Sequence, residues 1–353
     1  MFKQFTIQAP LPAIEAELQQ KIDGKTKPLG ALGELENIAF QLGRIQQTST
    51  PNVSNAKMVV FAADHGVVAQ GISLFPQEVT PQMVMNFLMG GAAVSVFCEQ
   101  HHVPLRVVDV GVNAMLDGHP LLGDRKVAFA SKDFSQEAAM SAEQVAQSIQ
   151  AGVDEADLAI DDGANLLMFG EMGIGNTCVS SCMMTALIGV SATDSTGRGT
   201  GLDSAGVSHK ALIIEQSLRR AELATGQVMS EWSAQTLAEQ VGGFEILAMA
   251  GAMLQSAQRQ TAFVVDGFIC SVALLFAQKV VPNVREYAIF AHQSNEKAHK
   301  MLLSHLSAEP ILSLDLRLGE GSGAILAYPL IKSACIFLKN MASFESAGVS
   351  DSK

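Results

Sequence analysis

The sequence predicts an α/β protein in which three α/β/α layers enclose a mainly parallel, Rossmann-like sheet, with a small helical subdomain beside them. Short apolar runs rich in β-branched residues alternate with longer helical patterns along most of the chain. Most positions in these short runs are apolar without alternation, which is typical of parallel strands covered by helices on both faces. Residues 1–50 differ, because their hydrophobic period is helical and they carry little strand signal.

The same patterns give the order of the elements along the chain. Candidate strands are 58–63, 105–110, 126–130, 166–170, 262–265, 287–291 and 311–314. Candidate helices are 33–46, 79–100, 142–162, 178–190, 204–224, 244–258, 268–280, 294–304 and 324–339. Parallel sheets of this kind bind ligands at the carboxyl ends of their strands, so a site is expected in the loops that follow these strands.

A chain of 353 residues is long enough for one large domain and a smaller one. We expect residues 51–342 to form the large α/β catalytic domain. Residues 1–50 are expected to join the C-terminal helix in the small subdomain. Residues 343–353 are polar and are expected to form a flexible tail.

The composition favours a globular protein without a nucleic-acid or membrane partner. Apolar residues make up 48% of the chain and charged residues 16%, which is too apolar for disorder. The net charge of −12 argues against nucleic-acid binding. Residues 1–6 lack the apolar core of a signal peptide, and the apolar stretches 242–257 and 261–281 contain Glu245 and Asp266. We therefore expect a cytoplasmic protein in which these stretches are buried.

The five cysteines form no Cys-x-x-Cys pair. Cys178 and Cys182 fall four residues apart on a candidate helix, a spacing that could present two thiolates to a metal. No histidine cluster accompanies them, so we expect buried cysteines, no disulfide and no zinc.

One carboxylate, Glu320, stands between Gly319 and Gly321 just ahead of the apolar run 324–338. Glycines let backbone N–H groups approach a ligand closely, and a helix N-terminus favours an anion. A glutamate there is suited to hold a proton-bearing group beside a phosphorylated substrate. Taken alone, the segment fits a plain helix entry, whose acidic residue interacts with the helix dipole, better than it fits a site.

Other predicted strand ends are also rich in glycine and small polar residues. The segment 169–177 reads as a strand, a glycine turn and a helix capped by Asn176 or Thr177, which is the geometry of an anion cradle. It lacks the lysine of a Walker A loop and the third glycine of a dinucleotide fingerprint. The segment 197–201 adds Arg198, and Asp266-Gly267, 292–294 and Asp315 follow further strands. Each segment fits an ordinary turn. Together they favour a buried nucleotide site for a single phosphate, without magnesium.

Asp64 and His65 follow the first predicted strand. The pair could bind a metal or move protons, and it could equally be a turn stabilised by aspartate.

Six segments in order carry a more specific resemblance. They are 27–33 (KPLGALG), 63–67 (ADHGV), 76–80 (PQEVT), 171–177 (EMGIGNT), 197–199 (GRG) and 318–321 (LGEG). The chain from about Lys25 to Ala342 is similar to the nicotinate-nucleotide–dimethylbenzimidazole phosphoribosyltransferases, which build the lower-ligand nucleotide of cobalamin.

The resemblance implies a transfer of 5-phosphoribose from nicotinate mononucleotide to 5,6-dimethylbenzimidazole, giving nicotinate and α-ribazole 5′-phosphate. It implies that Glu320 is the general base, and that Glu171 stabilises positive charge near the sugar. The phosphate and ribose would be held by Gly173, Gly175, Gly199, Gly201, Gly267, Ser294, Asp315 and Gly321. The flat base would lie against Phe75, Met83, Phe87 and Leu318, although these residues also fit plain core. No metal or cofactor is implied, and the family is homodimeric.

Other functions remain open at this point. A nucleoside phosphorylase-like glycosyltransferase also needs a phosphate cradle and a carboxylate facing a base nitrogen. A non-catalytic nucleotide-binding sensor would use Glu320 only to read a base edge, and a metal hydrolase would be centred on Asp64 and His65. The preferred acceptor, whether benzimidazole, purine or phenolic, also stays open.

Overall fold

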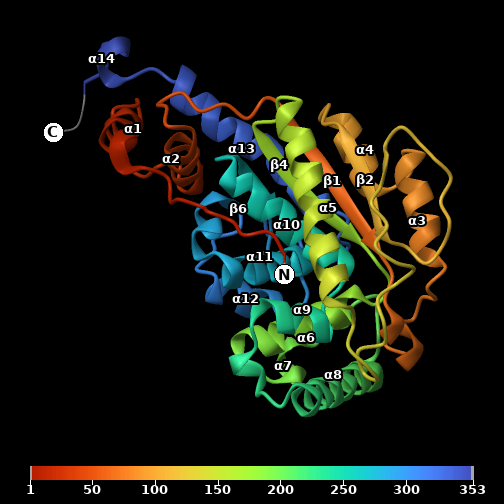
Figure 1. The fold of residues 1–353 in the computed structure, drawn as a ribbon. Helices are drawn as coiled ribbons and strands as arrows, with labels where there is room; N and C mark the ends of the chain where they lie inside the picture. Colours follow the sequence, from red (N-terminus) through yellow and green to blue (C-terminus); the bar gives the residue numbers. More distant parts are fainter. Residues whose placement is uncertain (1, 351–353) are drawn as a thin grey trace.

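A six-stranded sheet forms the centre of the computed structural model, which describes residues 2–350 (Figure 1). The strands are β1 Ala56–Ala63, β2 Leu105–Gly111, β3 Leu122–Asp124, β4 Leu166–Met172, β5 Ala262–Val265 and β6 Ala288–Phe290. Their order is β3-β2-β1-β4-β5-β6, and every neighbouring pair is parallel. The predicted α/β fold with a parallel sheet is therefore confirmed.

Helices connect these strands and cover both faces of the sheet. The α-helices are α1 Glu15–Asp23, α2 Glu34–Gln46, α3 Val79–Leu88, α4 Ala93–Gln100, α5 Ala142–Asp161, α6 Asn176–Ile188, α7 Ala192–Ser195, α8 Ser204–Thr225, α9 Ala234–Val241, α10 Phe244–Gln258, α11 Phe268–Val280, α12 His299–His305, α13 Ser322–Asn340 and α14 Phe344–Ala347. The 3-10 helices are η1 Pro12–Ile14, η2 Gly66–Gln70, η3 Met229–Glu231 and η4 Pro282–Tyr287.

The directions of the crossover connections determine which face of the sheet each helix covers and where a ligand-binding crevice forms. The chain passes from β1 through α3 and α4 to β2 on one side, and from β3 through α5 to β4 on the other. Because parallel crossovers are right-handed, α3 and α4 lie on the opposite face from α5. α10 packs on β1, β2, β4 and β5 beneath α5, while α13 contacts α4. The crossover direction changes between β1 and β4, and ligands bind at the carboxyl ends of strands at such a point.

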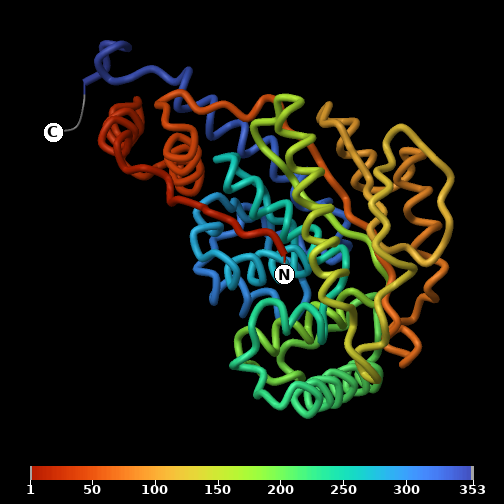
Figure 2. The backbone as a smooth tube through the Cα atoms, in the orientation of Figure 1, coloured from red at the N-terminus to blue at the C-terminus, as the bar shows by residue number. Residues whose placement is uncertain are grey.

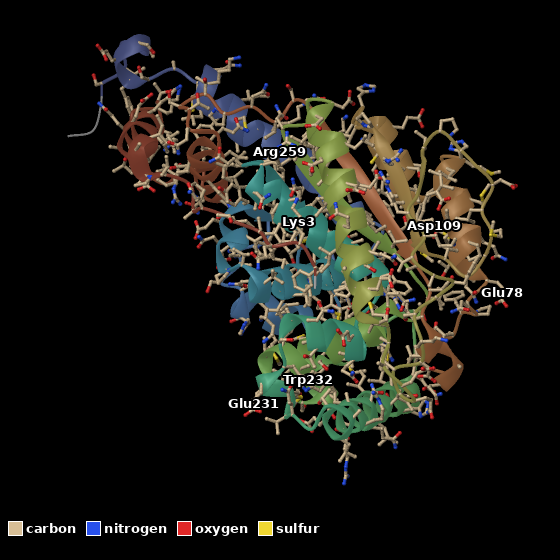
Figure 3. The ribbon with its side chains drawn as sticks, in the orientation of Figure 1. Lys3, Glu78, Asp109, Glu231, Trp232 and Arg259 are labelled. Atoms are coloured by element: carbon tan, nitrogen blue, oxygen red, sulfur yellow. The ribbon has the colours of Figure 1, made fainter. Side chains whose placement is uncertain are left out.

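Five of the seven predicted strands match β1, β2, β4, β5 and β6 within two residues. The prediction of a strand at 126–130 is wrong, because the short β3 precedes it. Lys126 instead forms an ion pair with β2, with its Nζ 2.7 Å from Oδ2 of Asp109. Asp109, labelled in Figure 3, lies near the end of β2. The prediction of a strand at 311–314 is also wrong, since the segment contributes only an isolated bridge between Leu312 and His292.

Two predicted helices have different bounds in the structure. The predicted helix 79–100 is two helices, because Gly90, with a φ of 78°, interrupts it after α3. The predicted helix 294–304 begins only at His299. Ser294 instead donates its backbone N–H to the Nδ1 atom of His299, 2.8 Å away.

The N-terminal helices contact the C-terminal segment (Figure 2). Lys25 and Ser343 form an antiparallel bridge, and the N–H of Phe344 donates to the carbonyl of Gly24. α14 lies within the segment that was expected to be a flexible tail, and a Ser343 capping box stabilises it. Residues 351–353 of that segment lie outside the described residues.

Residues 79–100 and α13 are long and apolar enough to cross a membrane by length and composition alone. In the structure the first stretch is broken in two, while α13 packs on β4, α4 and α2. α13 is therefore a largely buried helix of the fold, whereas α3 and α4 are buried on one side only. All five cysteines, which lie within residues 2–350, are free and buried.

Candidate active site

A cavity of about 430 Å³ opens at the carboxyl ends of β4 and β5. It is lined by Phe75, Val79, Met83, Glu171, Met172, Gly173, Ile174, Asn176, Thr177, Gly199, Thr200, Asp266, Gly267, Phe268, Ile269, Cys270, His292, Ser294, Glu296, Arg317, Leu318, Gly319 and Glu320. Polar loops and two carboxylates named from the sequence, Glu171 and Glu320, therefore share one cavity with apolar side chains. Its size suits a small organic ligand.

Glu320 stands at the entry of α13 in a left-handed backbone conformation. Its φ is 66°, and Gly319 and Gly321 beside it have φ values of 86° and 88°. Asp266, at the end of β5, holds this turn from outside. Its carboxylate accepts the N–H groups of Gly321 at 3.2 Å and Ala324 at 2.8 Å. The first N–H groups of α13 are thus already bonded to protein, and they fix the direction of the Glu320 side chain.

The Glu320 carboxylate is buried, with a residue exposure of 6%. Its Oε2 accepts the N–H of Val94 at 3.4 Å. Burial, with a smaller contribution from the charge of Asp266, raises the pKa of Glu320 above its usual range. A carboxylate with a raised pKa is a stronger base for abstracting a proton.

Glu171 lies at the end of β4 and links two loops of the cavity. Asn176, the first residue of α6, donates its side-chain N–H to Oε2, and the carboxyl group faces Gly319. Burial, followed by the charges of Glu245 and Asp266, raises the pKa of Glu171 to about 8. Both effects favour the uncharged form of Glu171.

A buried cation lies behind the polar side of the cavity. Lys210 on α8 has no exposed surface, and its Nζ donates to Oγ1 of Thr177 at 2.8 Å. The same Nζ would lie 3.3 Å from a Cβ placed on Gly199. Burial lowers the pKa of Lys210. Lys210, Thr177 and Gly199 thus place a cation beside backbone N–H groups, as a phosphate site requires.

The structure brings part of the predicted binding set to the cavity. Among the predicted phosphate and ribose residues, Gly173, Gly199, Gly267 and Ser294 line it. Among the predicted base-binding residues, Phe75, Met83 and Leu318 line it.

The remaining predicted residues lie outside this lining for identifiable reasons. Gly175 begins α6 at a φ of 95° and faces Val68, while Gly201 faces Leu74. Gly321 donates its N–H to Asp266. Phe87 is buried in the core, and Asp315 is exposed.

Several lining or supporting residues were given no role by the sequence. Lys210 was missed because nothing in the pattern of α8 marks it as buried. Asp266 and His292 appear only as strand-end residues, yet their side chains lie 3.7 Å apart in the wall. Arg317 lines the cavity, whereas Arg198, the cation suggested by the sequence, is exposed and outside the lining.

Asp64 and His65 form a buried cluster beneath the cavity rather than a part of its wall. The Nε2 atom of His65 is 3.0 Å from Oε1 of Glu245 on α10, and Oδ2 of Asp64 accepts the N–H of Asn113. Burial opposes a charge on His65, but Glu245 and Asp64 raise the pKa of His65 on balance. Within residues 2–350, no group of three or more His, Cys, Asp and Glu side chains is arranged to hold a metal.

Comparison with known proteins identifies the family. A family model described as "Phosphoribosyltransferase" matches residues 7–349. The nicotinate-nucleotide–dimethylbenzimidazole phosphoribosyltransferase of Aromatoleum aromaticum is 48% identical over 347 residues, covering 98% of this chain and 99% of the relative. The chain belongs to the nicotinate-nucleotide–dimethylbenzimidazole phosphoribosyltransferase family.

Two further members of this family agree. The Vibrio vulnificus enzyme of the same name is 47% identical over 342 residues, covering 95% of this chain and 97% of the relative. The crystal structure of CobT from Thermus thermophilus superposes with a TM-score of 0.92 at 40% identity. That comparison covers 97% of this chain and 100% of the other, so the whole fold is shared.

Proposed function

We propose that this protein transfers 5-phosphoribose from nicotinate mononucleotide to 5,6-dimethylbenzimidazole, releasing nicotinate. The proposal rests on the side chains that line one cavity. Two buried carboxylates, Glu171 and Glu320, face a polar side backed by Lys210 and an apolar side that includes Phe75 and Met83. A nucleotide and a flat aromatic base need these two surfaces side by side.

The chemistry follows from the charges of the two substrates. The nicotinate ring is bound to C1′ as a pyridinium, so it leaves without an acid. One benzimidazole nitrogen attacks C1′ while the other nitrogen loses its proton to Glu320, and the product base is left neutral. Attack from the face opposite nicotinate converts a β-glycosidic bond into an α bond. The product is α-ribazole 5′-phosphate, the lower-ligand nucleotide of cobalamin.

Lys210 and the loops around Gly173 and Gly199 hold the phosphoribose in this proposal. A buried lysine that reaches the wall at Thr177 supplies an N–H donor to a phosphate, and the negative phosphate in turn favours the charged form of this lysine. Phe75, Met83 and Leu318 provide an apolar surface for the base. Such a surface discriminates a single methyl group by only about 1–3 kcal/mol, so related azoles are expected to react.

The direct test is mass spectrometry of purified protein incubated with nicotinate mononucleotide and a panel of azoles. We expect nicotinate and the α-nucleotide to form only when an azole is added. Release of free base that depends on inorganic phosphate would instead identify a nucleoside phosphorylase. Binding of the nucleotide without consumption would identify a sensor.

We also propose that the enzyme works as a cytoplasmic homodimer. α13 and α4 contact each other, and they expose Ile336 and Val96 at 52% and 48% of their surface. Apolar side chains exposed on adjacent helices favour association. Sedimentation velocity should show a dimer, and a monomer throughout the micromolar range would contradict this proposal.

A further inference from the structure

Carboxylates gather around one end of the cavity. Glu171, Asp266 and Glu320 line it, and each is at most 6% exposed. Glu245 lies behind Glu171, and its charge acts on Glu171. Among the described residues, no lysine or arginine forms an ion pair with any of these four. Two imidazoles contact this group, His65 beside Glu245 and His292 beside Asp266, and Arg317 also lines the cavity.

Glu171 is at the centre of this group. Its carboxyl is held by the side chain of Asn176 and by the backbone N–H of Glu320, so it cannot turn away to solvent. Charged or titratable groups face it from four directions: Glu245 on α10 with His65 and Asp64 behind it, Asp266 after β5 with His292, Cys270 on α11, and Glu320 at the entry of α13.

Several buried carboxylates that share one cavity repel one another when they are ionised, and this repulsion favours the uncharged form of one of them. Asp266 has His292 beside it and accepts N–H groups of α13, whereas Glu171 faces Glu245 and Asp266. Burial, Glu245 and Asp266 raise the pKa of Glu171 to about 8. The uncharged form of Glu171 therefore relieves the repulsion while the cavity is empty. A cation close to Glu171 would stabilise its ionised form and so lower its pKa.

The nucleotide assigned under the proposed function brings a positive charge at the ring nitrogen that is joined to C1′, separate from the carboxylate on the opposite part of the nicotinate ring. We propose that Glu171 is protonated in the ligand-free enzyme and loses this proton to solvent when the pyridinium nucleotide enters the cavity. The step is a simple ionisation: the O–H bond of the carboxyl group breaks, the carboxylate stays in the wall and the proton passes to the buffer.

This exchange prepares the enzyme for bond cleavage. As nicotinate leaves, positive charge moves from the ring to C1′ and the ring oxygen of the ribose. A carboxylate formed on binding is then already in place to stabilise that charge, without reorganisation during the reaction. The inference rests on the proposed function, and it adds a protonation change that the transfer itself does not require.

Isothermal titration calorimetry near pH 7.5 tests this proposal directly. Binding heats of nicotinate mononucleotide are measured in buffers of different ionisation enthalpy, and their slope gives the number of protons released. Ribose 5-phosphate is the comparison ligand, because it carries the phosphate without the nicotinate ring and its pyridinium nitrogen. We expect the nucleotide to release more protons than ribose 5-phosphate, by up to about one.

Two variants locate the proton. Glu171→Gln should remove the difference between the two ligands, while Glu215→Gln, which changes an exposed carboxylate on α8 outside the cavity, should leave it as in the wild type. Equal release for both ligands in the wild type would overturn the proposal. A difference that survives in a folded Glu171→Gln protein would overturn it too.

A measurement on the wild type alone gives a second criterion. Between about pH 6.5 and pH 8 the affinity for the nucleotide should rise with pH by up to about tenfold per unit relative to ribose 5-phosphate. A flat ratio would contradict the proposal. A protein that converts the nucleotide in the presence of an azole but releases no extra proton when it binds the nucleotide alone overturns this inference only. A protein that neither binds nor converts the nucleotide overturns the proposed function as well.

Discussion

Glu320 shows how a single residue is prepared for chemistry. A non-glycine residue in the left-handed region costs about 1–3 kcal/mol, and such strain persists only where the surroundings impose it. Here Asp266 imposes it by binding the N–H groups of Gly321 and Ala324. The carboxylate thus enters the cavity already oriented, and its orientation costs no entropy during the reaction.

Replacing Glu320 by Gln keeps the size and hydrogen bonding of the side chain but removes the proton acceptor. We expect turnover with dimethylbenzimidazole to fall by ~10²–10⁴-fold, while nicotinate mononucleotide still binds. The loss should shrink for a phenolate acceptor, which has no proton to give up. Steady-state kinetics with both acceptors checks this prediction. If the variant turned over dimethylbenzimidazole at the wild-type rate, another residue would be the general base, and Glu171 would be the next candidate.

The same reaction should need no metal, because the departing pyridinium is already activated. Turnover should therefore be unchanged after dialysis against EDTA. Activity that disappears in EDTA and returns with magnesium or zinc would favour a metal-assisted mechanism instead.

At the scale of elements, the loops that follow β4 and precede α8 form the polar side of the cavity. Gly199 has a φ of 51°, and a Cβ there would lie 2.8 Å from Oγ1 of Thr177 and close to the Nζ of Lys210. We expect Gly199→Val to weaken binding of nicotinate mononucleotide while the fold is retained. Gly118→Val is the control, since no atom lies within 4 Å of its Cβ position. Equal affinities of the two folded variants in calorimetry would show that this loop is an ordinary turn.

The start of α10 is joined to the end of β1 by the buried pair of Glu245 and His65. Removing one partner of a buried ion pair costs about 3–5 kcal/mol, because the other group is left uncompensated. We therefore expect Glu245→Ala to destabilise the protein by about this amount, and Glu245→Gln, which can still accept from His65, by less. Urea unfolding gives both values, and equal stability of Glu245→Ala and the wild type would show that the pair is neutral.

The elements also show what the sequence could and could not predict. β1, β2 and β4 are long apolar runs, so pattern alone locates them within two residues. β3 has only three residues, Leu122–Asp124, and its pairing with β2 leaves no periodic signal. The two carboxylates of the cavity follow from family motifs, whereas Lys210 and the bond from Asp266 to Gly321 depend on contacts between distant segments.

For the whole molecule, keeping carboxylates buried in an empty cavity has a consequence for stability. Burial raises the pKa values of Asp64, Asp266 and Glu320 as well as that of Glu171. Each of these groups binds its proton more tightly in the folded than in the unfolded chain. The ligand-free protein is therefore expected to be most stable on the acidic side of neutrality, in contrast to proteins whose acids are ion-paired.

The pKa of Glu171 defines the pH range in which this stability is lost. Its pKa is about 8 in the folded protein and near 4.5 when unfolded, so between these values the folded state binds more protons. Its contribution to stability is complete below the unfolded value and is lost as the pH rises through about 8. We expect the Tm of the ligand-free protein to fall between pH 6 and pH 8.5, and Glu171→Gln to flatten this decline, as measured by differential scanning calorimetry. Nicotinate mononucleotide should protect the wild type more at the higher pH, because its pyridinium compensates the carboxylate that has formed. A Glu171→Gln protein with the same pH dependence as the wild type would show that another group carries the proton.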